Sequence, residues 1–166
     1  MASSYTAALN ALGHMSFDWI IIIALIVLVA GESLRSGTNK AIALSLALPL
    51  GYVMYGFLQN AAFLQNSLAG EAANPTAQAV IFLGLLIVAF LLVYRCVSFY
   101  GASSGGMFGS AVVGISTVII LLVFWLQVPA LSTLWKFGPQ IQSVFAEAYR
   151  FWWLIGAYFV LAAFRS

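Results

Sequence analysis

The stretch that decides the fold is Ala111-Val-Val-Gly-Ile-Ser-Thr-Val-Ile-Ile-Leu-Leu-Val-Phe-Trp-Leu126, the most continuous apolar run in the chain. It contains no charged residue, and its flanks extend it to a segment from about Met107 to Val128. A helix rises about 1.5 Å per residue, so roughly 20 such residues cross the ~30 Å hydrocarbon core of a bilayer. The run therefore predicts a transmembrane helix over 107–128.

The composition of the whole chain indicates the same environment. Of its 166 residues, 64% are hydrophobic and 6% are charged, whereas a typical soluble domain has roughly 25% charged residues. Six Lys or Arg and four Asp or Glu cannot cover a soluble domain of this length, so lipid must be the solvent for most of the apolar surface. We predict an all-α, polytopic integral membrane helical bundle with four to five transmembrane helices and a short N-terminal surface helix.

Three further apolar stretches predict spans at about 17–34, 41–58 and 77–94. The first two are separated by a polar break from Gly31 to Lys40, and its two glycines, Gly31 and Gly37, can end one helix and turn the chain. Pro49 lies inside the second span, where its missing N–H and its ring are expected to kink the helix.

The N-terminal tail over 1–16 precedes the transmembrane domain, which we place at 17–166. Within the tail, residues 5–14 carry apolar side chains at helical spacing and predict the short surface helix. The first fifteen residues contain no Lys or Arg, so the basic region of a cleavable secretory signal is missing. We therefore expect this N-terminus to be the mature one.

The C-terminal region is aromatic as well as apolar. Residues 140–150 alternate polar and apolar side chains and predict a helix lying in the membrane interface. The segment over 150–165 either forms a fifth span or ends as a hydrophobic foot in one leaflet. We favour the span, because Arg150 and Arg165 can extend to opposite membrane surfaces.

The basic residues predict an orientation for a five-span bundle. On one side lie Arg35, Lys40, Arg95 and Arg165, and on the other lie Lys136 and Arg150. Loops rich in Lys and Arg tend to stay in the cytoplasm. We therefore expect the N-terminus outside and the C-terminus in the cytoplasm.

Small residues recur on one side of the chain entering the span at 107–128. Gly105 and Gly109 are four residues apart, and Ser110 and Gly114 continue the spacing. In lipid such a bare face permits close approach of another helix. We interpret these four residues as a helix-packing surface, for a helix of this chain or of another copy, and leave the preceding stretch over 101–104 as loop.

Charged residues at the two ends of the first span are the candidates for a polar pathway. Asp18 precedes the span and is interpreted first as an N-cap and helix-dipole partner. Glu32 and Arg35 are three residues apart and can form an ion pair on one helix face. The alternative is that Asp18, Glu32 and Arg35 line a polar pathway, since an ionisable group within a span is the first candidate for a functional residue.

The sequence offers little for catalysis or metal binding. One His, the single Cys96 and four scattered acids do not form a metal-binding spacing or a catalytic motif. Cys96 cannot form an internal disulfide, and we interpret it as a small hydrophobe. The scattered basic residues lack the clustering that nucleic-acid binding needs. We expect no enzyme activity, no cofactor, no metal and no nucleic-acid partner.

Several short motifs occur in a recognisable order. They are Phe17-Asp18-Trp19 before an Ile-rich run, Gly31 to Gly37 leading into Lys40-Ala-Ile-Ala-Leu-Ser45, Gly106-Met-Phe-Gly109 with Gly114 beyond it, and Leu131-Ser-Thr-Leu-Trp-Lys136 followed by Pro139. Over residues 17–140 this order resembles the colicin V production protein family. The resemblance implies a multi-pass protein of the bacterial inner (cytoplasmic) membrane, connected with toxin export or envelope maintenance, and it supplies no catalytic residues.

Two functions remain open from the sequence. The first is a non-enzymatic membrane protein that acts by helix association, as a homo-oligomer or as a subunit of an export or envelope-maintenance assembly; its partners are the lipid bilayer and other membrane subunits. The second is a small channel or transporter that uses Asp18, Glu32 and the Pro49 kink. An intramembrane enzyme rests on no motif.

Overall fold

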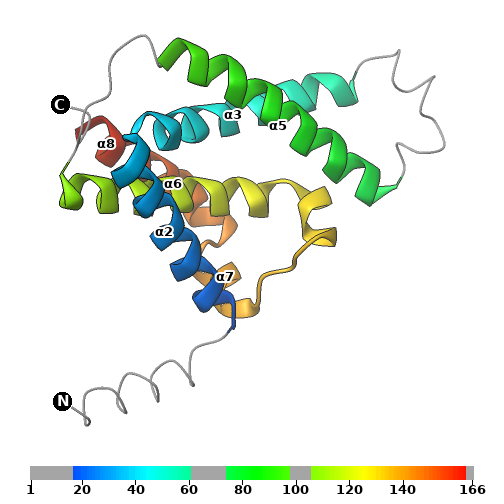
Figure 1. Ribbon diagram of the computed structural model, residues 1–166. Coiled ribbons are helices and arrows are strands. Elements are labelled where there is room, and N and C mark those ends of the chain that lie inside the picture. The colour runs from blue at the N-terminus through cyan, green and yellow to red at the C-terminus, as the bar shows by residue number, and fades with distance from the viewer. Residues whose placement is uncertain (1–16, 61–73, 98–105, 164–166) are drawn as a thin grey trace.

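A computed structural model describes residues 17–60, 74–97 and 106–163, and these are helical without a strand. The long helices are α2 (Phe17–Ser36), α3 (Asn39–Gln59), α5 (Pro75–Val97) and α6 (Met107–Gln127), shown in Figure 1. All four are long and apolar enough to cross a membrane. The prediction of an all-α, multi-pass membrane bundle is thus confirmed, and the first four predicted spans are each matched by a helix. The predicted surface helix over 5–14 lies outside the described residues.

The turn between α2 and α3 is shorter than the sequence suggested. Gly31 and Glu32 belong to α2, which continues to Ser36, so the prediction that Gly31 ends the first helix is wrong. Gly37 makes the turn, with a φ of 82° that side chains disfavour. Lys40 is likewise helical, in the first turn of α3.

The segment after α6 forms η2 (Pro129–Thr133), α7 (Pro139–Val144) and α8 (Glu147–Ala163). The single interfacial helix expected over 140–150 is wrong, because the backbone leaves helical geometry at Phe145. Two side chains of α8 satisfy the carbonyls left at this break: Arg150 Nε donates to Phe145 O at 3.1 Å, and Trp153 Nε1 donates to Val144 O at 3.0 Å. Arg150 is therefore engaged within the chain.

The segment predicted as a fifth span corresponds to α8. This helix has 17 residues, which at 1.5 Å per residue gives about 26 Å, the short limit for crossing a ~30 Å core. It runs back beside α6, and its red C-terminal end lies near the start of α6 (Figure 1). Membrane crossing by α8 stays a prediction.

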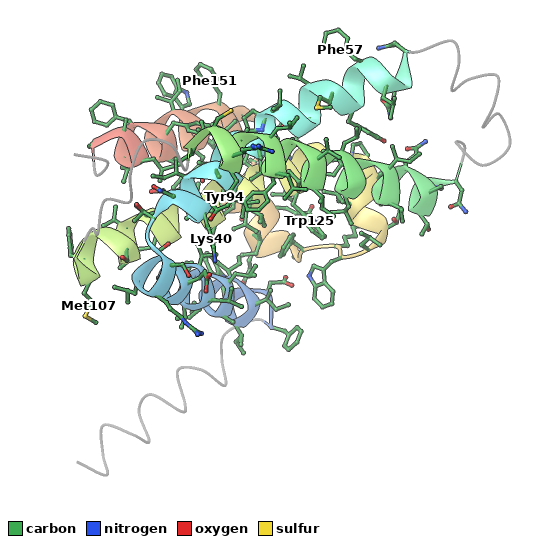
Figure 2. The ribbon with its side chains drawn as sticks, turned by 45° about the horizontal axis from the view of Figure 1, so that its top comes forward. Lys40, Phe57, Tyr94, Met107, Trp125 and Phe151 are labelled. Atoms are coloured by element: carbon green, nitrogen blue, oxygen red, sulfur yellow. The ribbon has the colours of Figure 1, made fainter. Side chains whose placement is uncertain are left out.

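α6 is the hub of the bundle. Over half of its most apolar stretch, 56%, is buried, against 11% for α2 and for α5. α2 and α8 pack on α6, α3 contacts both α6 and α5, and η2 lies against α5 and α6. The apolar faces left over point outward, as the exposed side chains of Phe57, Met107 and Phe151 show in Figure 2. Most of the surface of α2 and α5 is therefore available to lipid or to other helices.

Candidate functional site

Asp18 joins two parts of the chain that are 120 residues apart. It lies in the first turn of α2, and its Oδ2 accepts a hydrogen bond of 2.6 Å from the backbone N–H of Gly138, just before α7. A Cβ added at Gly138 would lie 2.7 Å from the same oxygen, so the Asp18 carboxylate would have to shift to accommodate a side chain there. The interpretation of Asp18 as an N-cap is wrong, because α2 already begins at Phe17 and the Asp18 carboxylate accepts from a distant loop. Its place in the first turn still suits a helix-dipole partner.

Glu32 pairs with a residue that sequence spacing did not suggest. Its Oε1 lies 2.6 Å from Lys40 Nζ across the α2–α3 turn, and Ser36 Oγ donates to the same oxygen at 2.9 Å. The expected pair with Arg35 is therefore wrong. The reason is that Gly37 folds α3 back and brings the first turn of α3 to the last turn of α2. Arg35 lies near enough to act electrostatically on both charges.

The predicted packing surface of small residues is used in part. At Gly114 an added Cβ would lie 3.0 Å from both the Cβ and the backbone N of Ala30, so α6 and α2 cross in close contact there. Ser110 is fully buried. Gly109 has nothing within 4 Å of an added Cβ in the part of the chain that the structure describes, and Gly105 lies outside that part. Packing within the chain thus uses one end of this surface and leaves Gly109 open.

A buried polar network ties α3 to α6 and α8. Pro49 has no N–H to donate to the carbonyl of Ser45, and the hydroxyl of Tyr158 donates to that carbonyl instead, at 2.7 Å. The Ser45 hydroxyl bonds to Ala41 O at 2.9 Å and to the hydroxyl of Thr117 at 3.0 Å. α3 continues through Pro49 as one helix; its kink stays a prediction. The proline therefore exposes a helix carbonyl that α8 uses as an anchor.

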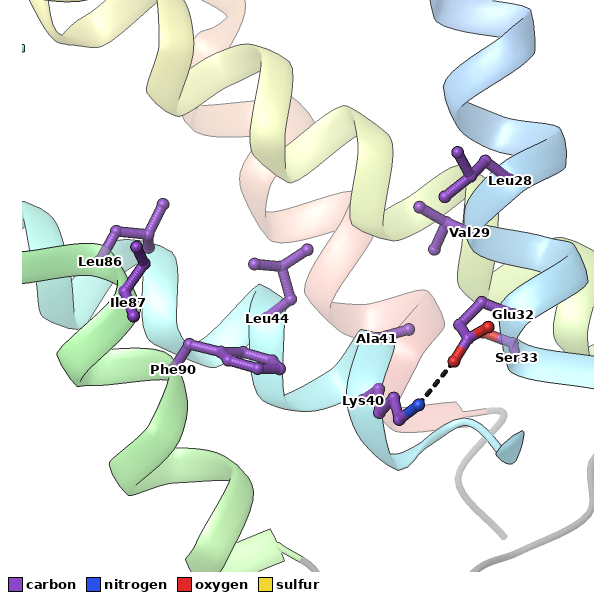
Figure 3. Close-up of a pocket in the computed structure, with 10 residues that line it drawn as sticks. All are labelled: Leu28, Val29, Glu32, Ser33, Lys40, Ala41, Leu44, Leu86, Ile87 and Phe90. Atoms are coloured by element: carbon purple, nitrogen blue, oxygen red, sulfur yellow. Dashed lines mark hydrogen bonds and ion pairs between the residues drawn. The ribbon is translucent and has the colours of Figure 1, made fainter. Parts of the chain in front are cut away.

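A groove lies between α2 and α5, with α3 as its floor. It has a volume of about 320 Å³ and an almost wholly apolar lining, and Figure 3 shows the Glu32–Lys40 pair at one end of it. Ser33 also lines the groove; it is 4% exposed, and its buried hydroxyl has no hydrogen-bond partner among the described residues. Sequence reasoning missed both Lys40 and Ser33. A basic residue placed just after a helix turn was the one available signal for Lys40.

A second cavity lies toward the opposite ends of α3 and α5, beside η2. Its volume is about 300 Å³, and it is more polar than the groove. The polar residues around it are Tyr52, Tyr55, Gln59, Gln78 and Gln127. Tyr55 and Gln78 face each other across α3 and α5 with their polar atoms 3.5 Å apart.

Within the parts of the chain that the structure describes, no group of three His, Cys, Asp or Glu side chains lies close enough to hold a metal ion. Cys96 is a free, exposed cysteine at the end of α5. The chain matches no protein-family profile, no curated protein and no solved structure. Inferences about function therefore rest on the helices and on the polar groups described above.

Proposed function

We propose that this integral membrane protein acts without catalysis, by helix association, either as a homo-oligomer or as a subunit of an export or envelope-maintenance assembly. The observation that carries the proposal is the open start of α6. Among the described residues, Gly109 has no neighbour within 4 Å of an added Cβ, and Met107 and Phe108 beside it are exposed. A small residue flanked by exposed apolar side chains is the surface on which helices associate in lipid.

Membership of the colicin V production protein family is part of the same proposal. Its support is the order of motifs over residues 17–140. Residues of two of these motifs make contacts within the chain. Asp18 of Phe17-Asp18-Trp19 bonds to the loop before α7, and Gly114 allows α2 to cross α6 closely. An inner-membrane location and a link to toxin export follow from this resemblance alone.

The association surface predicts the effect of Gly109→Leu. Leucine fits at this position without disturbing the monomer, because the space around Gly109 is open, but it blocks the approach of a second helix. We expect the particle extracted in mild detergent to lose its partner subunits, as measured by chemical crosslinking and native mass spectrometry.

The matched control is Gly84→Leu, since Gly84 lies within α5 and is equally open. Loss of assembly in Gly109→Leu but not in Gly84→Leu supports the surface at the start of α6. An unchanged particle mass in Gly109→Leu counts against it.

The proposed orientation places the α2–α3 turn and the end of α5 in the cytoplasm, and Cys96 tests it. This lone cysteine is exposed and follows Arg95 at the end of α5. In intact cells a membrane-impermeant maleimide should leave Cys96 unlabelled until the membrane is permeabilised. A cysteine placed at Lys136 in a Cys96→Ser background should be labelled directly. Labelling of Cys96 in intact cells reverses the proposed topology.

The alternative of a channel or transporter has less support. Asp18 and Glu32 lie about 21 Å apart along α2, and each is held by hydrogen bonds within the chain. The residues between them, from Trp19 to Gly31, are uncharged. The observation in favour of this alternative is the polar cavity beside η2, which lies toward the other end of α3 from Lys40.

A further inference from the structure

The groove between α2 and α5 combines an apolar lining with a charged end. Leu28 on α2, Leu44 on α3, and Ile87 and Phe90 on α5 form its apolar part, and Glu32 and Lys40 close one end (Figure 3). The charged end coincides with the last turn of α2 and the first turn of α3, beside the short turn that joins the two apolar helices. Such a gradient from apolar to charged matches an amphiphile oriented along the membrane normal.

Ser33 supplies a second and independent indication of a ligand. Its side chain is 4% exposed and its hydroxyl has no hydrogen-bond partner, yet it lines the groove next to Glu32. A buried hydroxyl without a partner costs free energy that a ligand acceptor would recover. It is the single buried side-chain polar atom without a partner among the described residues.

The charge at this end of the groove favours an anion. Lys40 has three N–H donors, and its ion pair with Glu32 uses one of them. Arg35 acts on the same pair, and Arg95 lies in the last turn of α5, so basic residues outnumber Glu32 at this end of the described helices. Basic pockets between transmembrane helices bind anionic lipid headgroups.

We propose that the groove binds one anionic membrane phospholipid, with its phosphate at Lys40 and Ser33 and an acyl chain along Leu44, Ile87 and Phe90. The volume of about 320 Å³ falls at the small end of the range for ligand pockets. The apolar lining suits an acyl chain, and the charged end suits the headgroup of the same lipid. The site is separate from the association surface at Gly109.

Native mass spectrometry of the detergent-purified protein tests the proposal. Phosphatidylglycerol and phosphatidylcholine with identical acyl chains are added in turn, and the lipid retained per chain is counted. We expect one phosphatidylglycerol per chain and weaker retention of phosphatidylcholine. Lys40→Gln should weaken phosphatidylglycerol retention by about tenfold, since it removes a charged hydrogen-bond donor.

Two further variants keep the test decisive. Lys40→Gln leaves Glu32 without its ion pair, so a loss of lipid in that variant could come from poor folding. Ile87→Trp tests the groove independently, because it fills the groove from an exposed position and should abolish lipid retention. Lys136→Gln removes a basic residue outside the groove and should retain lipid as the native chain does. Equal retention of both lipids, retention that survives Ile87→Trp, or equal loss in Lys136→Gln overturns the proposal.

Discussion

Replacing Gly114 by leucine is expected to force α2 away from α6 and to destabilise the bundle. An added Cβ at this position already lies 3.0 Å from the backbone N of Ala30 and 3.1 Å from its Cα. Backbone atoms cannot move aside as a side-chain tip can, so the whole of α2 would have to shift. Overpacking a core by a few methylenes costs about 1–3 kcal/mol, and a full leucine here should cost about 3 kcal/mol or more.

The measurement is the thermal unfolding midpoint of the detergent-purified protein, followed by circular dichroism. Gly84→Leu is the control, since it makes the same chemical change in open space within α5, away from the proposed association surface. Leucine is a better helix former than glycine by about 0.8 kcal/mol, so the control should be neutral or slightly stabilising. Gly114→Ala should fall between the two. Equal midpoints for the two leucine variants would contradict the close crossing.

Removing the Asp18 carboxylate is expected to release the loop before α7 from the start of α2. The Oδ2 of Asp18 accepts the Gly138 N–H at 2.6 Å in a partly buried setting. Hydrogen bonds to charged groups contribute about 1.5–3 kcal/mol, so Asp18→Ala should lower the free energy of unfolding by that amount. Asp18→Asn retains an uncharged acceptor and should lose less.

A double-mutant cycle isolates this contact. Gly138→Ala alone should destabilise the protein, because its Cβ would lie 2.7 Å from Asp18 Oδ2. In the Asp18→Ala background that oxygen is absent, and the same substitution should cost much less. The double variant should therefore lose less stability than the sum of the losses in the two single variants. Strict additivity in the unfolding measurements would show that the two residues do not interact.

The apolar runs of the sequence were sufficient to locate the membrane helices. Each of the first four predicted spans is matched by a helix whose ends differ from the prediction by a few residues. The largest difference is at Gly31, because a glycine alone does not end a helix. α2 continues until Gly37, where the backbone adopts a positive φ. Composition could not distinguish these two glycines.

The candidate site was less predictable. The spacing of Glu32 and Arg35 allows a pair, but the turn at Gly37 offers Lys40 as a closer partner. The spacing of the small residues likewise predicted close helix packing but did not identify the helix that packs there. In the structure, Ala30 on α2 packs against Gly114. Tyr158 had no sequence signal, because its role depends on the carbonyl that Pro49 leaves free on another helix.

The amino-acid sequence was enough to identify a helical membrane protein and to locate its helices. The physical reason is that a bilayer core demands about 20 apolar residues per crossing and requires each backbone N–H and carbonyl to be satisfied within the segment. Which helix faces meet is visible in the folded chain alone, where Asp18 bonds to Gly138 and Tyr158 to Ser45 across more than a hundred residues. Faces toward lipid and faces toward other helices are both apolar, so hydrophobicity does not specify which contacts form.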